Sequence, residues 1–123
     1  MKHNPFHKAL QCAGHGIGFT FISQRNFQYH CILAVSAIGL GLYFRITHLE
    51  WLSLILSISF VLMAELFNTA IEIAVDLTTR KQKYRARLSK DIAAGAVLLS
   101  AINALVIGYL IFYHRFDTLM VGG

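Results

Sequence analysis

Long apolar runs separated by short charged segments dominate the pattern of this sequence. Residues 92–113 contain no formally charged side chain, and about 20 apolar residues are enough to cross a bilayer core. A second run, 51–64, is uncharged until it meets Glu65, and a third occupies 31–44. Each of these two runs is shorter than a full span, so each must take in flanking polar residues. The pattern predicts three transmembrane helices, at about 27–46, 51–76 and 90–113.

The N-terminal segment follows a different pattern. Apolar residues recur every three or four positions with polar ones between them, at Phe6, Leu10, Ala13, Ile17 and Phe21. This periodicity predicts an amphipathic surface helix at about 5–24, lying in the headgroup plane. Three glycines, Gly14, Gly16 and Gly18, interrupt it. Each weakens a helix by up to about 1 kcal/mol relative to Ala, so we expect flexibility or a close contact there.

Composition agrees with a membrane protein. Of the 123 residues, 56% are hydrophobic and 14% are charged, against roughly 45–50% and about 25% in soluble domains. The prediction is a single all-α integral membrane domain over residues 1–123.

Lysine and arginine predict the orientation. Nine of the eleven lie before the first span or in the loop between the second and third, and only Arg45 and Arg115 lie on the other side. The positive-inside rule therefore places the N-terminus and the basic loop in the cytoplasm. Topology and anionic headgroups account for this charge, so no nucleic-acid partner is expected.

Acidic residues interrupt the second span. On a helix, Glu65, Asn68, Glu72 and Asp76 fall within roughly 100° of one another, so they share one face. An ionised carboxylate at the bilayer centre costs about 2.5–3.5 kcal/mol, so these groups need partners or water. An oligomer with the acidic faces turned inward would supply both. A seam of small residues on the third span could mediate assembly or pack within one protomer: Ala96, Ser100, Ala104 and Gly108.

Lys90 and Asp91 stand at the predicted start of the third span. There a lysine could help bind phosphates, and the acid could simply be a favourable first-turn residue behind a Ser89 cap. Taken together, carboxylates able to hold Mg²⁺, a base at the depth of lipid hydroxyls and a phosphate-binding cation predict phosphoryl transfer to a lipid. A purely structural role for the acids is the alternative.

Two motifs resemble the prokaryotic diacylglycerol kinase family of small three-span lipid kinases. They are E-L-F-N-T-A-I-E-I-A-V-D at 65–76 and K-D-I-A-A-G-A-V-L-L at 90–99. R-N-F-Q-Y-H at 25–30 and L-E-W-L at 49–52 look more like its undecaprenol kinase branch. The resemblance implies a homotrimeric bundle in the cell membrane, with ATP as phosphate donor, Mg²⁺ as cofactor and an active site at the cytoplasmic face shared between neighbouring subunits.

The resemblance also implies roles for individual residues. Glu65 would be the general base on the lipid hydroxyl, and Asn68 would help to shape the site. Glu72 would hold Mg²⁺. The nucleotide pocket would be lined by Asp76, Lys90 and Asp91. Gln24 stands where many relatives carry a glutamate that serves as a second metal ligand. Its amide oxygen can coordinate Mg²⁺ but brings no charge, so metal affinity should be lower or another acid must help.

The predicted function is therefore ATP-dependent phosphorylation of a membrane lipid alcohol. Branch likeness alone favours undecaprenol over diacylglycerol, whose phosphorylation would produce phosphatidic acid. A hypothesis of another class is a proton- or ion-conducting oligomer with Glu65 and Glu72 as relay carboxylates. A third is a catalytically silent assembly subunit.

Overall fold

The computed structural model describes residues 5–78 and 83–122, and within them the chain forms four helices and no strand. These are α1 (Phe6–Ser23), α2 (Arg25–Phe44), α3 (His48–Thr78) and α4 (Tyr84–Val121). The last three are long and apolar enough to cross a membrane. The predictions of an all-α chain and of three apolar spanning helices are confirmed.

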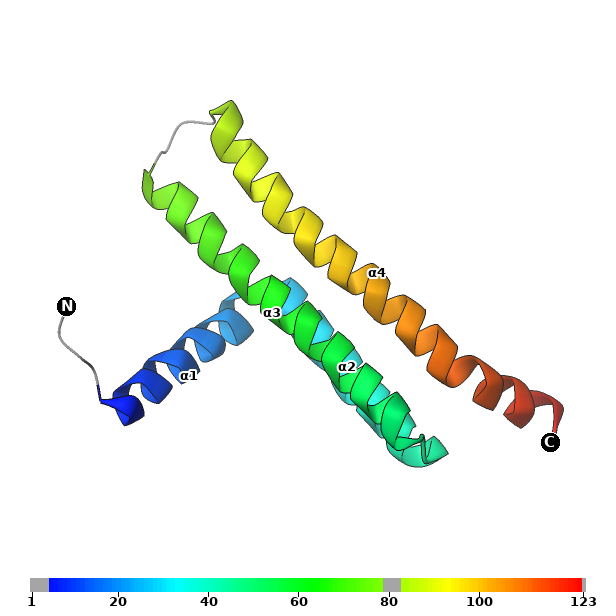
Figure 1. Cartoon of the computed structure of the whole chain (residues 1–123). Coiled ribbons are helices and arrows are strands. Elements are labelled where there is room, and N and C mark those ends of the chain that lie inside the picture. The colour runs from blue at the N-terminus through cyan, green and yellow to red at the C-terminus, as the bar shows by residue number, and fades with distance from the viewer. Residues whose placement is uncertain (1–4, 79–82, 123) are drawn as a thin grey trace.

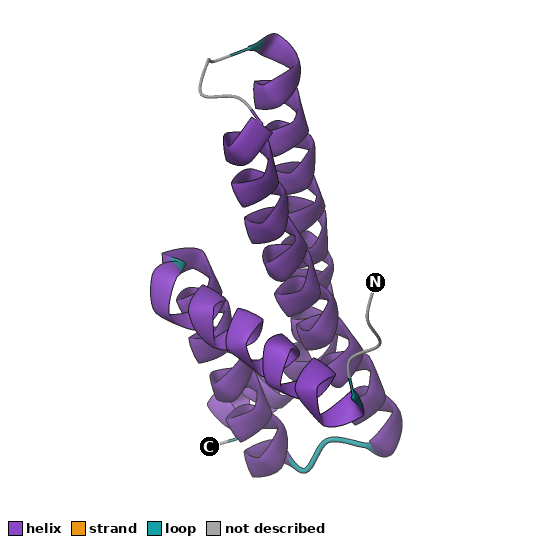
Figure 2. Ribbon diagram, turned by 90° about the vertical axis from the view of Figure 1, so that its left-hand side faces the viewer, coloured by secondary structure: helices purple, strands orange, loops and turns teal. Residues whose placement is uncertain are grey.

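The helices pack as an antiparallel hairpin with two shorter additions (Figure 1). α3 and α4 lie side by side over most of their length, and α2 lies along the part of α3 that follows the α2–α3 turn. α1 leaves the bundle obliquely and crosses α3. Figures 1 and 2 both show the α3–α4 hairpin extending well beyond the corner where α1 meets α2. The second half of α3, which carries the acids, therefore lies at and beyond that corner.

Backbone and side-chain hydrogen bonds hold the corner between α1 and α2. The Gln24 N–H donates to the Thr20 carbonyl at 2.9 Å, and Gln28 Nε2 donates to the carbonyls of Phe21 and Ile22 at 2.8 and 3.3 Å. These bonds satisfy carbonyl groups that the end of α1 leaves unpaired. Phe27 is buried beside them. The first turns of α2 are thus anchored to α1.

A second set of local bonds builds the turn between α2 and α3. Arg45 adopts the left-handed conformation, with φ of 53°, and the Ile46 N–H donates to the Gly41 carbonyl at 3.2 Å, which is a Schellman ending. Thr47 and Glu50 then form a capping box: the Thr47 N–H donates to Glu50 Oε1 at 2.9 Å, and the Glu50 N–H donates to Thr47 Oγ1 at 3.2 Å. The chain therefore reverses direction within three residues.

A small apolar cluster joins α3, α4 and this turn, formed by Ile46, Leu54, Ile111 and Phe112. Trp51 packs against it and lies so close to Gly41 that a Cβ there would be 2.9 Å from the indole ring. Most other large apolar side chains are exposed in the single chain. In a membrane, lipid or neighbouring chains cover such surfaces.

One expectation about local structure is wrong, and a second is tested only in part. α4 begins at Tyr84 with Lys83 as N-cap, so Lys90 and Asp91 lie well inside the helix, and the Ser89 hydroxyl donates to the Arg85 carbonyl instead of capping. The helix-terminus argument for phosphate binding at Lys90 therefore fails, because the free N–H groups lie nearly two turns earlier. For Gly14, Gly16 and Gly18 of α1 we expected flexibility or a close contact. Within the described chain the close contact is not seen, since a Cβ at any of the three would meet nothing within 4 Å, and flexibility stays a prediction.

Candidate functional site

One face of α3 changes from apolar to polar along the helix. Its buried residues recur every three or four positions, which places them on a single stripe: Leu54, Ser57, Val61, Glu65 and Thr69. Glu65 is the first carboxylate on this stripe, and its side chain is only 3% exposed. Thr69 Oγ1 donates to the Glu65 carbonyl at 3.0 Å, so the next polar side chain is satisfied locally. The helix thus directs a carboxylate into the bundle.

His30, from α2, is the neighbour that meets the buried carboxylate. Its Nε2 lies 3.3 Å from Glu65 Oε1, within ion-pair distance, and its side chain is 21% exposed. This separation is slightly longer than the roughly 2.7–3.2 Å of a well-formed N–H···O bond, and Oε1 is fully buried without an aligned hydrogen bond. The contact therefore needs only a small adjustment to become a hydrogen bond.

Asn68 and Glu72 pair with each other one turn further along α3. Asn68 Nδ2 donates to Glu72 Oε1 at 3.3 Å, and the Asn68 amide oxygen is buried without a partner among the residues described. Glu72 is half-buried. An amide oxygen and a partly solvated carboxylate on the same face are both groups that accept bonds from, or coordinate, an incoming ligand.

Asp76 ends the polar face and reaches α4. Its Oδ1 lies 2.6 Å from Lys90 Nζ, and both side chains are accessible, at 66% and 36% exposed. Asp91 is exposed and follows Lys90 on the helix. The structure thus brings together two of the three residues predicted to line a nucleotide pocket, at the end of the hairpin where the loop between α3 and α4 begins.

Gln24 lies at the α1–α2 corner, half-buried, and no hydrogen bond in the described part of the chain joins it to Glu72. The contact between His30 and Glu65 nevertheless gives a common reference point from which the heights of Gln24 on α2 and Glu72 on α3 can be compared. Because α2 and α3 are antiparallel, Gln24 lies about 9 Å from His30 along α2, and Glu72 lies about 10 Å from Glu65 along α3 in the same direction. The two predicted metal ligands are therefore at similar depths.

Within residues 5–78 and 83–122, no three His, Cys, Asp or Glu side chains gather closely enough to hold a metal ion. The polar groups instead form a strip from Glu65 to Asp76, about 16 Å long at 1.5 Å per residue.

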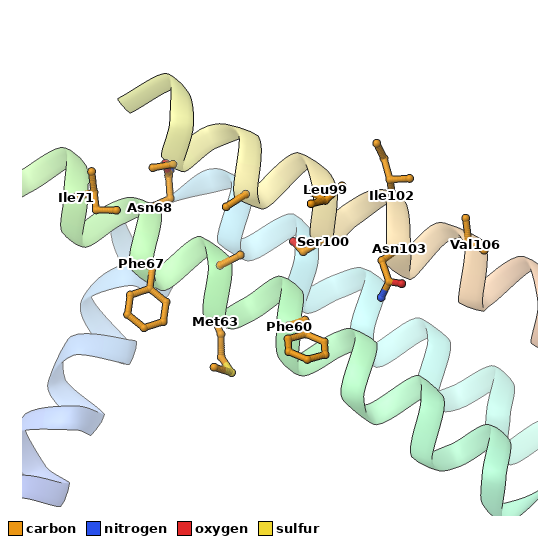
Figure 3. Close-up of a pocket in the computed structure, with 13 residues that line it drawn as sticks. Phe60, Met63, Phe67, Asn68, Ile71, Leu99, Ser100, Ile102, Asn103 and Val106 are labelled. Atoms are coloured by element: carbon orange, nitrogen blue, oxygen red, sulfur yellow. The ribbon is translucent and has the colours of Figure 1, made fainter. Parts of the chain in front are cut away.

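Beside this strip, α3 and α4 enclose a groove of about 920 Å³ (Figure 3). Its walls are largely apolar, with Phe60, Met63 and Phe67 on α3, and Leu99 and Val106 among the residues on α4. Asn68, Ser100 and Asn103 are the polar members of the lining. The polar strip and the apolar groove meet at Asn68.

The structural roles of four residues were not predicted from the sequence: Arg115, Glu50, Thr47 and His30. The Arg115 guanidinium makes a bidentate contact with Glu50, at 2.7 and 2.8 Å, and ties the end of α4 to the start of α3. The T-x-x-E spacing of Thr47 and Glu50 is a recognisable capping signal that could have located this helix start. His30 had a weaker signal, as an ionisable side chain at the edge of an apolar run.

Comparison with known proteins extends over most of the chain. A sequence profile described as "Prokaryotic diacylglycerol kinase" matches residues 11–112. A protein named undecaprenol kinase from Bacillus subtilis is 41% identical over 112 residues, which is 91% of each chain. A diacylglycerol kinase from Synechocystis is 38% identical over 110 residues, covering 86% of this chain and 61% of that protein. A diacylglycerol kinase from Escherichia coli is 23% identical over 114 residues, covering 90% of this chain and 93% of that protein. The resemblance noted in the two motifs is confirmed.

Proposed function

Because this chain belongs to the prokaryotic diacylglycerol kinase family and is an ATP-dependent lipid kinase, we propose that its acceptor is undecaprenol rather than diacylglycerol. The identity to the Bacillus subtilis undecaprenol kinase, 41% against 38% and 23% for the two diacylglycerol kinases, supports this choice. Phosphorylation of diacylglycerol is the alternative.

The observation that carries the catalytic proposal is the burial of Glu65 on the stripe where α3 turns polar. A general base must reach the proton that it removes and must be shielded from bulk water. In the proposal Glu65 accepts the proton of the lipid hydroxyl as the hydroxyl oxygen attacks the γ-phosphorus of ATP, and ADP leaves. Asn68, one turn away, orients Glu72 through its amide N–H groups.

The remaining residues act on the nucleotide. Lys90 places a cation beside the phosphates, and Asp76 and Asp91 border the same end of the strip. Bound Mg²⁺ would neutralise phosphate charge in the transition state. Glu72 is the residue best suited to hold it, since it is half-buried and already bonded to Asn68. Gln24, at a similar depth, offers a neutral oxygen ligand.

A homotrimer is part of the same proposal. Asn103 is exposed on α4 toward the apolar groove, and the Asn68 amide oxygen is buried without a partner in the described chain. An exposed amide such as that of Asn103 is costly in hydrocarbon, so a neighbouring subunit that fills the groove and bonds to it is the physical solution. Ala96 and Ser100 line the groove and permit close helix approach. Neighbouring subunits would also complete the metal ligands that one chain lacks.

Orientation in the membrane follows the charges. The loop end of the α3–α4 hairpin carries Asp76, Lys90 and the basic residues around it, of which Arg80 and Lys81 lie outside the described residues. At the opposite end Glu50 neutralises Arg115. The excess positive charge therefore gathers at the loop end, which we place in the cytoplasm, where ATP is available.

Purified protein in mixed micelles with labelled ATP and Mg²⁺, given undecaprenol or diacylglycerol separately, tests the acceptor. We expect faster transfer to undecaprenol. Glu65→Gln should lower kcat by about 10²- to 10⁴-fold, the usual contribution of a positioned general base, and leave the oligomer intact. A higher kcat/KM with diacylglycerol would overturn the choice of lipid. Undiminished turnover by Glu65→Gln would overturn the assignment of the base.

A further inference from the structure

We propose that His30 is a positioning residue that orients the Glu65 carboxylate for proton transfer. The inference rests on the proposed role of Glu65 as base. Its observation is separate: an imidazole nitrogen from α2 lies 3.3 Å from an oxygen of a carboxylate on α3 that is 3% exposed. No other ion pair in the described part of the chain joins α2 to α3.

Glu65 needs such a partner because of where it lies. The carboxylate cannot be stabilised by bulk water at this exposure, and Oε1 has no aligned hydrogen bond. Glu72, two helical turns further along α3, is a like charge and cannot help. The imidazole of His30 is the group within reach that can donate a hydrogen bond to Oε1. A donor on Oε1 leaves Oε2, which makes no hydrogen bond to the described residues, for the lipid hydroxyl.

The backbone around His30 is suited to hold the imidazole still. Gln28, two residues earlier, donates hydrogen bonds to two carbonyls at the end of α1. Phe27 is only 4% exposed, and its ring packs edge-on against the ring of Phe21. α2 is therefore fixed to α1 within one turn of His30. Hydrogen bonds at catalytic groups are often long in the free enzyme and shorten when substrate binds, so a separation of 3.3 Å is suited to tightening during the reaction.

A rigid donor on the base has a defined kinetic consequence. Misplacing a catalytic group by about 1 Å can cost about 10²-fold in rate without weakening substrate binding. Loss of the imidazole should therefore lower kcat and leave both KM values nearly unchanged. A histidine that only filled space would show a change in stability instead, with kcat preserved in the folded fraction.

The test uses full-length protein in mixed micelles with ATP, Mg²⁺ and undecaprenol. His30→Phe keeps a planar ring and removes the donor, and we expect kcat to fall about 10- to 100-fold with KM values within about two-fold. His30→Gln restores an N–H donor and should recover most of the loss. Tyr29→Phe, at the adjacent, 54% exposed position, is the matched control and should behave as the native protein. Gel filtration and thermal melting establish that each variant is folded.

Combination with Glu65→Gln separates the two proposals. In that background His30→Phe should have little further effect, because its partner in catalysis is already lost. Full activity of folded His30→Phe, with Glu65→Gln inactive, would overturn the role of His30 alone. Full activity of Glu65→Gln would overturn the base assignment, and the role of His30 with it.

If the phenylalanine variant does not fold, His30→Gln and His30→Asn provide the same test. They carry the same amide, but the shorter side chain cannot reach Oε1 across the gap between α2 and α3. We expect the glutamine variant to be at least about ten-fold more active, by the same sensitivity of rate to position. Equal kcat values for these two variants would overturn the inference.

Discussion

Exchange of the charges at Asp76 and Lys90 separates a structural from a chemical role for this ion pair. The two groups lie 2.6 Å apart and connect α3 to α4 at the loop end of the hairpin. If their purpose is to join the helices, the double variant Asp76→Lys/Lys90→Asp preserves it. If Lys90 acts on the phosphates of ATP, the same variant removes a cation from the place where negative charge must be met.

The structure gives different magnitudes for the two roles. The side chains are 66% and 36% exposed, so solvent screens the pair, and its contribution to stability should be about 0–1 kcal/mol. A charged donor aimed at a reacting phosphoryl group contributes far more to the rate, about 10²- to 10³-fold for a single positioned donor. We therefore expect Lys90→Met to lose activity by about that factor while its melting temperature barely changes.

The assay is the initial rate of labelled phosphate transfer in mixed micelles at saturating lipid, with ATP varied. Arg87→Met removes an exposed cation one helical turn before Lys90 and serves as the control for general electrostatic attraction of ATP. We expect its kcat to stay within about two-fold of native, since Arg87 is exposed and solvent and salt weaken the effect of its charge. The charge-exchanged variant should be as inactive as Lys90→Met. Recovery of most of the native rate by the exchanged pair would refute the reasoning and leave the pair a purely structural link.

Three further predictions concern packing, the outer ion pair and the metal. Gly41→Ala should lower the free energy of unfolding in detergent by about 1–3 kcal/mol, because its Cβ would overlap the Trp51 ring. Gly39→Ala, with open space around its Cβ, should be neutral or stabilising. Equal melting temperatures of the two variants would contradict the close packing at Gly41. Glu50→Gln keeps the capping box but loses the charge opposite Arg115, so we expect the free energy of unfolding to fall by about 1 kcal/mol. Glu50→Ala loses both contacts, and we expect it to fall by about 2 kcal/mol. Chemical denaturation should rank the variants in that order, and the reverse order would be incompatible with the two observed contacts. Gln24→Glu should lower the Mg²⁺ concentration needed for half-maximal activity, since a carboxylate adds charge to the metal site, and an unchanged Mg²⁺ titration would exclude position 24 as a ligand.

Local patterning along the chain was sufficient to predict the helices. Apolar runs of near-membrane length and a three- to four-residue period are properties of neighbouring residues, so they indicate spanning and surface helices without any knowledge of packing. The same periodicity placed Glu65, Asn68, Glu72 and Asp76 on one face of α3, because helix geometry alone determines that relation. The start of α4 was placed at Lys90, but the helix begins at Tyr84. The apolar run marks only the part of α4 that is long and uncharged, and the charged turns before Lys90 are also helical.

Which residue meets which across helices was decided only by the tertiary structure. His30 and Glu65 are 35 positions apart, and Glu50 and Arg115 are 65 apart. Their contacts depend on the tight turn at Arg45, on the capped corner at Gln24 and on the register in which α4 returns along α3. Helical periodicity determines the direction of a side chain from its own axis, but register and rotation between helices arise from packing of the whole bundle. For this reason the sequence by itself determined that four polar side chains share one face of α3, and only the fold gave the buried Glu65 carboxylate a partner.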